Sequence, residues 1–285
     1  MSNMRSKSET PPRQDVPTDD SKRDSSKASP AAPLILALDT ATEVRSVSIA
    51  RGEEVLACRS GRVQRENSAS VLQDIDEALA AAGVKLREVE LFAVATGPGS
   101  FTGLRSGIAT IKAFAATFNR PVAGVPTLHA VAFAAGTGRR VLASLPAGRG
   151  EVFAQLLSIS FEGENAFEEL SEPFHLRPSA LLEKAAQWGG NLTWAGSGAQ
   201  THVAAIREFA AERNIVWRDE AAAGDESVGA EGACWTLAPP CESYAERIAA
   251  LGLINYRRGS TIVAEDLYAL YVRLSDAELN ERCRR

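Results

Sequence analysis

Apolar residues follow two patterns along the chain, and each pattern is interrupted by short turns. Leu34–Leu38 is a continuous apolar run, typical of a strand buried on both faces, whereas Val44–Ala50 largely alternates like a half-buried strand. From Val71 to Ala82 the apolar residues recur at helical spacing, and Gly83 ends the predicted helix. The elements predicted in this part are strands 34–38, 44–50 and 55–58, a helix after the cap residues 67–70, strand 91–96, helix 102–118, strand 121–125 and helix 127–135.

This order of elements predicts a mixed sheet covered by helices. The opening hairpins supply antiparallel strands, and the strand–helix–strand crossovers that follow supply parallel ones. The succession resembles the ribonuclease H-like unit, which is half of the actin, hexokinase and Hsp70 architecture. The predicted fold class is therefore α/β: a two-lobed actin-like (ribonuclease H-like, ASKHA) fold with mixed sheets flanked by helices.

The rest of the chain predicts a second, less regular lobe. Its elements are strands 141–145, 152–159 and 192–195 and helices 178–188, 200–211 and 242–255. Residues 220–240 lack periodicity and are expected to form a surface loop. The predicted organisation is a disordered tail at 1–32, an N-terminal lobe at 33–137, and a second lobe at 138–285 that includes the loop and the C-terminal helix.

Composition and charge narrow the class of protein. The tail is rich in Ser, Pro and charge, so it cannot bury enough apolar surface to fold, and it has no apolar core of a signal peptide. The formal net charge of -5 argues against a general polyphosphate binder. No apolar stretch has the length of a transmembrane helix, and the 4 cysteines form no CxxC pair. We expect a reduced, cytoplasmic protein that does not associate with a membrane.

The most informative segment joins a buried strand to a helix. It reads Gly97, Pro98, Gly99, Ser100, Phe101, Thr102, Gly103, Leu104 and Arg105. Backbone N–H groups at such a junction can hold an anion, but the Lys-Ser/Thr of a Walker A loop and the glycine spacing of a dinucleotide site are missing. A tight structural turn and a phosphate cradle are equally open interpretations. At the end of the first strand, Asp39, which precedes Thr40, either supports magnesium-nucleotide chemistry or, as we favour, caps a turn.

Histidine and serine patterns predict no catalytic or metal-binding residue. The histidines, His129, His175 and His202, are not spaced i, i+3 or i, i+4, so they form no HxxxH or HExxH site, and each is expected on a surface or helix face. The chain also lacks the GxSxG elbow of a serine hydrolase.

Three segments carry a resemblance to a known family. They are residues 36–42 (LALDTAT), residues 97–105 (GPGSFTGLR) with Gly107 after them, and residues 124–128 (GVPTL). In order and spacing they closely resemble the TsaB (formerly YeaZ) family of the bacterial tRNA threonylcarbamoyladenosine machinery. The resemblance is strong over 33–135 and looser at 150–153 and 270–273, where Tyr271 and Arg273 are similar to a C-terminal family signature. One departure is Pro146-Ala147-Gly148, where the family often has Asp-Ala-Arg.

The resemblance implies a non-catalytic subunit. TsaB-like proteins are similar in fold to their partner TsaD, the transferase, whose i, i+4 pair of metal-binding histidines corresponds here to Thr127 and Val131. Neither residue type is a competent ligand for iron or zinc. The family pairs with TsaD, activates it and helps recruit the TsaE ATPase, so that the complex modifies the adenosine next to the anticodon. The resemblance also implies no cofactor of its own, a nucleotide (ATP or ADP) at the complex interface, and tRNA contact only through the complex.

Small residues beside the apolar stripes of the first two helices indicate a partner interface, because they permit close helix–helix approach. We expect this interface to include Ala69, Val71, Leu72, Ala78, Ala109, Ala113 and Ala116. Two alternatives stay open. The enzyme alternative is a stand-alone glycoprotease-like peptidase, which would need the missing histidines, or an ATPase. The other is a homodimeric protein with a regulatory role outside tRNA modification, which could use the same helices.

Overall fold

The computed structural model describes residues 32–62, 70–160, 167–218 and 233–272, and residues 32–285 group as one compact unit. The predicted tail, the cap residues 67–69 and most of the predicted loop at 220–240 lie outside the described residues. Within the described ranges, no helix has both the length and the apolar character needed to cross a membrane.

The first sheet contains five strands in the order β3-β2-β1-β4-β5. They are β1 (Leu34–Asp39), β2 (Val44–Arg51), β3 (Glu54–Arg62), β4 (Leu91–Gly97) and β5 (Val122–Pro126). The hairpin strands pair antiparallel, β1 with β2 and β2 with β3, whereas β4 lies parallel to β1 and β5 parallel to β4. Every residue of β1 and β4 is buried, as their continuous apolar runs predict.

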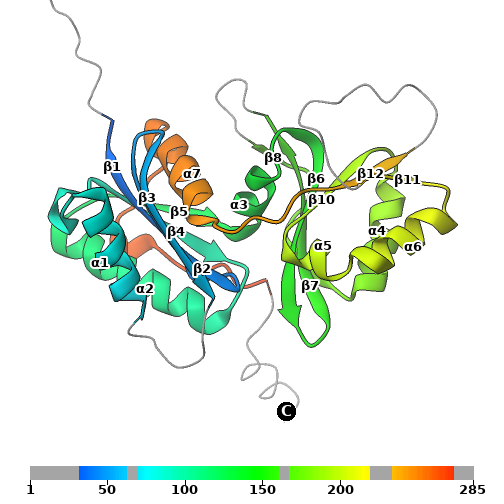
Figure 1. The fold of residues 1–285 in the computed structure, drawn as a ribbon, viewed down its shortest axis with the longest axis horizontal. Coiled ribbons are helices and arrows are strands. Elements are labelled where there is room, and N and C mark those ends of the chain that lie inside the picture. The colour runs from blue at the N-terminus through cyan, green and yellow to red at the C-terminus, as the bar shows by residue number, and fades with distance from the viewer. Residues whose placement is uncertain (1–31, 63–69, 161–166, 219–232, 273–285) are drawn as a thin grey trace, which may run out of the picture. The chain divides into compact units, whose positions relative to one another are not determined.

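Helices cover both faces of this sheet (Figure 1). Leu34, Leu36 and Leu38 face a core formed with α1 (Ser70–Ala82) and α2 (Phe101–Phe118). Ile35 and Ala37 face the opposite core, which contains α3 (Thr127–Ala134) and α7 (Ala245–Arg257). The alternation follows from the two-residue period of a strand. A short 3-10 helix, η1 (Leu86–Glu88), lies between α1 and β4.

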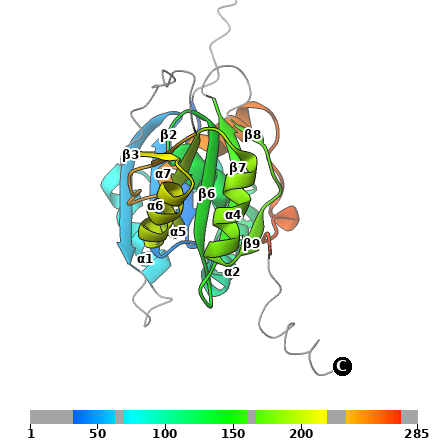
Figure 2. The same cartoon turned by 90° about the vertical axis from the view of Figure 1, so that its right-hand side faces the viewer.

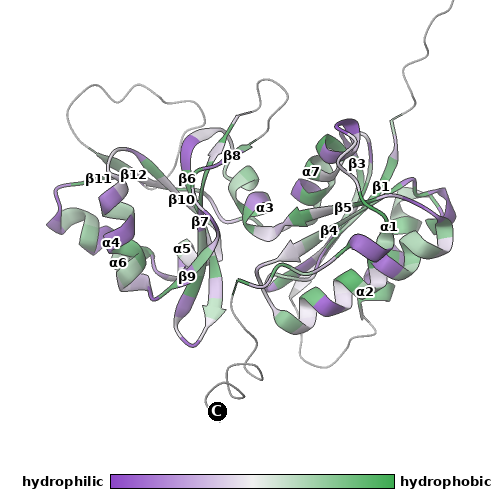
Figure 3. Cartoon of the chain, turned by 180° about the vertical axis from the view of Figure 1, so that it is seen from behind, coloured by the Kyte–Doolittle hydropathy of each residue, from purple (hydrophilic) through white to green (hydrophobic). Residues whose placement is uncertain are grey.

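The second sheet follows the order β11-β12-β10-β6-β7-β8, and β9 pairs with β7. Figure 2 looks at the face of this sheet on which α4, α5 and α6 lie. Its strands are β6 (Gly138–Gly148), β7 (Glu151–Ile159), β8 (Phe167–Glu169), β9 (Phe174–Leu176), β10 (Leu192–Ala195), β11 (Val216–Arg218) and β12 (Cys234–Leu237). One face packs on α4 (Pro178–Trp188), α5 (Ser197–Thr201) and α6 (Val203–Glu212), around the rings of Trp194 and Trp235, whose centroids are 5.2 Å apart. The other face shares the core of α3 and α7. Figure 3 shows the expected pattern, with mixed hydropathy on the outer helices α1, α4 and α6.

Two mixed sheets flanked by helices confirm the predicted fold class. The lobe boundary at 137/138 stays a prediction, but the place of the C-terminal helix was wrong: α7 packs on β1, β2, β4 and β5 of the first sheet. Its glycine Gly252 allows this, because a Cβ there would lie 2.8 Å from the Cβ of Ala93. The predicted loop at 220–240 was also wrong at one end, since it contains β12. The single helix predicted at 200–211 is divided between α5 and α6.

Candidate functional site

The glycine-rich segment leaves β4 and starts α2 in close contact with the turn that follows β1. A Cβ on Gly99 would lie 2.3 Å from the carbonyl oxygen of Ala41, and one on Gly103 would lie 1.8 Å from that of Thr40. Real Cβ atoms do not approach backbone so closely, so these glycines permit two backbone segments to touch. The segment that could have formed a phosphate cradle is packed against the backbone of residues 40 and 41.

Hydrogen bonds join the same two segments. Ser100 caps α2 by accepting from the Gly103 N–H at 3.3 Å, and its own N–H donates to the Ala41 carbonyl at 2.8 Å. Thr40 donates its hydroxyl to the Gly103 carbonyl at 2.7 Å. Of the two open interpretations, this arrangement favours the structural turn. Pro98 is buried, and Phe101, Thr102 and Arg105 are exposed at the start of α2.

Asp39 is fully buried and caps its own turn. Its Oδ1 accepts from the Ala41 N–H at 2.8 Å, and its Oδ2 accepts from the Thr42 hydroxyl at 2.6 Å. Burial raises the pKa of the Asp39 carboxyl to about 6, and the hydrogen bonds offset only part of this effect. The geometry agrees with the capping interpretation. No group of three or more His, Cys, Asp or Glu residues in the described part of the chain is placed to hold a metal ion.

The positions assigned to the transferase's metal ligands lie in the core of this chain. Thr127 is buried at the start of α3, where its hydroxyl accepts from the Gly97 N–H at 3.1 Å, and Val131 is 1% exposed. His129 is also buried, which corrects any expectation of a surface position. Its Nε2 lies 3.1 Å from Oε1 of Glu169 on β8, a contact that the sequence did not indicate. Burial lowers the pKa of His129 to about 4, because the charged imidazolium would lose its hydration in the core.

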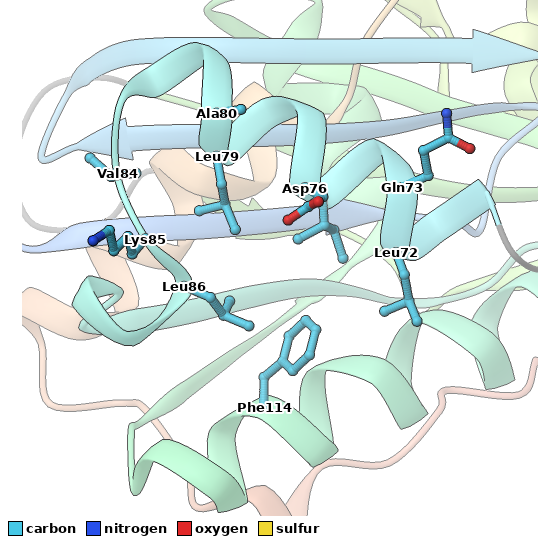
Figure 4. A pocket seen from close by; sticks show the side chains of 10 residues that line it. Leu72, Gln73, Asp76, Leu79, Ala80, Val84, Lys85, Leu86 and Phe114 are labelled. Carbon is cyan, nitrogen blue, oxygen red and sulfur yellow. The ribbon is translucent and has the colours of Figure 1, made fainter.

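An open groove of about 680 Å³ lies between α1, η1 and α2 (Figure 4). Figure 4 shows Leu72 of α1, Leu86 of η1 and Phe114 of α2 pointing toward the same space. Leu72 is 56% exposed although it is a large apolar residue. This groove opens on the face of α1 and α2 that was predicted to meet a partner, and we take it as the candidate site.

The structure corrects part of the predicted interface. Val71 and Ala78 are buried in the chain's own core, because they lie on the α1 face that covers the sheet, so they cannot meet a partner. Leu72, by contrast, points away from the sheet. The residues left exposed are Leu72, Ala109, Ala113 and Ala116, while Ala69 lies outside the described residues.

Comparisons with known proteins agree with this geometry. The family model "TsaD: tRNA N6-adenosine threonylcarbamoyltransferase" matches residues 61–219. The solved structure of YeaZ from Pseudomonas aeruginosa has a TM-score of 0.60 at 24% identity, covers 84% of this chain and 99% of that chain, and supports the fold. The tRNA threonylcarbamoyladenosine biosynthesis protein TsaB of Escherichia coli K12 is 32% identical over 188 residues, 65% of this chain and 78% of that protein.

The chain belongs to the TsaB family. TsaB of Haemophilus influenzae is a further relative, 37% identical over 123 residues, which cover 42% of this chain and 51% of that protein. The resemblance stated from the sequence motifs is thereby confirmed, and the chain is a member of a family of tRNA threonylcarbamoyladenosine biosynthesis proteins. In this TsaB-family chain, the glycine-rich motif shapes the start of α2.

Two buried titratable groups in this TsaB-family chain are expected to have opposite effects on how folding stability depends on pH in acid. Asp39 keeps its proton in the folded state up to about pH 6, so its contribution to stability falls as pH rises through the range between its unfolded pKa and 6. His129 stays neutral in the folded state down to about pH 4, so its contribution rises over nearly the same range. The two opposite changes in stability with pH largely cancel in the wild-type protein.

Replacing Asp39 by an uncharged residue removes its contribution to the pH dependence of the free energy of unfolding. In Asp39→Asn, the amide can donate to the Thr42 hydroxyl, which still donates to the Val44 carbonyl, so the turn is retained. Relative to wild type, the free energy of unfolding of the variant should increase by about 2 kcal/mol between pH 4 and pH 7. Urea unfolding at several pH values measures this. A difference between variant and wild type that does not change with pH would contradict the assignment.

Proposed function

We propose that this TsaB-family chain is a non-catalytic subunit that pairs with the TsaD transferase and activates it for threonylcarbamoylation of tRNA. The observation that carries the proposal is the apolar groove and small-residue surface on α1 and α2. Exposed apolar surface of this kind marks a protein interface. The outer side of α2 carries only small side chains at Ala109, Ala113 and Ala116, so a partner helix can approach closely.

The residues that occupy the transferase's metal positions support the non-catalytic part of the proposal. Thr127 and Val131 are both buried in the core, and neither supplies a nitrogen or thiolate ligand. The oxygens of Asp39 are both engaged within its turn. The transfer chemistry is therefore assigned to TsaD. The pair then helps recruit the TsaE ATPase, with ATP or ADP held at the complex interface, and contacts tRNA only as a complex.

The same surface favours a homodimer as the state of the chain without TsaD. The outer side of α1 carries the exposed acids Asp76 and Glu77, and the outer side of α2 carries Arg105 and Lys112. A two-fold axis would place α1 of one copy against α2 of the other, with opposite charges facing each other. This is a second use of the same interface.

Co-purification tests the proposal. The tagged full-length chain is mixed with cognate TsaD and TsaE, and the retained proteins are identified. We expect TsaD to be retained at an equal molar amount, and TsaE to be retained only when TsaD is present. Retention of neither protein, with the chain folded by circular dichroism, would contradict the proposed function.

A further inference from the structure

The C-terminal strap, defined here as residues 262–272, crosses from β5 to the glycine-rich segment. Ile262 and Val122 exchange two backbone hydrogen bonds of 2.9 Å at the edge of the first sheet. The 3-10 helix η2 (Ala264–Asp266) packs on α2. Farther on, the Leu270 N–H donates to the Thr96 carbonyl at 2.7 Å. The strap therefore has a fixed position beside α2.

Gly97 allows the strap to pack closely against the end of β4. Its φ is +113°, and a Cβ at this position would lie 2.5 Å from the Leu270 carbonyl oxygen. Both the backbone angle and the close contact require glycine. The first glycine of the motif thus positions the strap, while Gly99 and Gly103 position the turn after β1.

The strap exposes an unusual amount of apolar and aromatic surface. The exposed fraction is 72% for Tyr268, 49% for Tyr271 and 39% for Leu270, and the neighbouring Phe101 of α2 is 38% exposed. The rings of Phe101 and Tyr271 are 5.4 Å apart. Exposed rings in contact, together with an exposed leucine next to Tyr271 in the chain, form a patch of the kind that marks an interaction site.

Two cations of α2 lie over these rings. The Arg105 guanidinium is 3.9 Å from the centroid of Phe101, and the Lys112 ammonium is 4.8 Å from that of Tyr268. The Lys112 ammonium also donates to the Glu265 carbonyl at 3.2 Å. Exposed acidic residues, Glu265 and Asp266, stand beside it. Among the residues that the structure describes here, the two cations and two acids balance, which favours a protein over a nucleic acid as the occupant of the patch.

We propose that this patch, formed by Phe101, Arg105, Tyr268, Leu270 and Tyr271, is a second docking surface for the TsaD subunit. The proposal rests on the proposed function and extends its interface. The reason is continuity: Arg105, Ala109 and Ala113 follow one another at intervals of four residues on α2, so the patch and the small-residue surface lie along one helix face. Tyrosine and arginine are the residues that most often anchor protein interfaces. A partner seated on the alanines is expected to reach the tyrosines as well.

The test compares the double variant Tyr268→Ala/Tyr271→Ala with wild type in a TsaD-binding titration. Tyr256→Ala is the matched control, because Tyr256 is 41% exposed and lies on α7, which covers the opposite face of the first sheet. The single variant Tyr268→Ala accompanies the double one, since its highly exposed ring contributes least to folding. We expect the dissociation constant for TsaD to rise roughly tenfold in the double variant. The control should remain within about twofold, with unchanged melting temperatures.

Three outcomes would overturn the proposal. If Tyr268→Ala and the double variant bind TsaD like wild type while Ala113→Arg abolishes binding, the strap is no interface and the proposed function stands. If neither change affects binding, both proposals fail. If the strap variants lower the affinity of the assembled complex for an anticodon stem-loop RNA but not the affinity for TsaD, the patch is a nucleic-acid surface.

Discussion

Ala113→Arg is expected to weaken the binding of TsaD roughly a hundredfold while leaving the protein folded. Ala113 is exposed in the middle of α2, so the isolated chain can hold an arginine there in solvent, and arginine forms helices almost as well as alanine. In the complex the same guanidinium would meet an apolar, closely packed interface. Burying a charge without a partner costs about 3 kcal/mol or more, which corresponds to that loss of affinity.

A matched charge elsewhere provides the control. Gln187 is exposed on α4, which covers the second sheet, so Gln187→Arg adds the same charge far from the proposed interface and should bind TsaD normally. Titration calorimetry gives the affinities, and circular dichroism checks the fold. Ala113→Arg should also prevent any homodimer, which light scattering detects. A folded Ala113→Arg variant that binds TsaD as wild type does would place the interface elsewhere.

The parts of the fold that could be predicted are those where one physical signal dominates. The continuous apolar run at Leu34–Leu38 specifies a strand buried on both faces, and the helical spacing that ends at Gly83 specifies α1. The short turns between them allow few connections, so the mixed sheet follows. The interface prediction rests on a related signal, because small residues such as Ala109 and Ala113 lie beside the apolar stripe of α2.

Other parts of the fold could not be predicted because they depend on long-range packing. The four-residue strand β12 was missed because its apolar residues follow a stretch of Gly, Ala and acidic residues without a period. The position of α7 depends on contacts with strands that lie more than a hundred residues before it in the sequence, which no local pattern encodes. Helical spacing located the apolar stripe of α1 but not its rotation, so Leu72 and Val71 were not assigned to opposite environments.

The glycine-rich segment illustrates a different limit. A sequence of glycines with Ser100 and Thr102 fits an anion site and a tight turn equally well. Only the positions of Ala41 and Leu270, one from the turn after β1 and one from the strap, distinguish the two interpretations. The strap itself gave no strand or helix signal. Its functional interest depends on the exposure of Tyr268 and Tyr271, which becomes known only in the folded chain.

Threonylcarbamoylation of tRNA in a reconstituted reaction tests the central claim most directly. The complete mixture contains this chain, TsaD, TsaE, the enzyme that makes threonylcarbamoyl-AMP and its substrates, and unmodified tRNA, and the modified adenosine is quantified by mass spectrometry. We expect modification in the complete mixture and none above background when either TsaD or this chain is omitted. Steady modification by this chain in the absence of TsaD, or full activity of TsaD in the absence of this chain, would contradict the account.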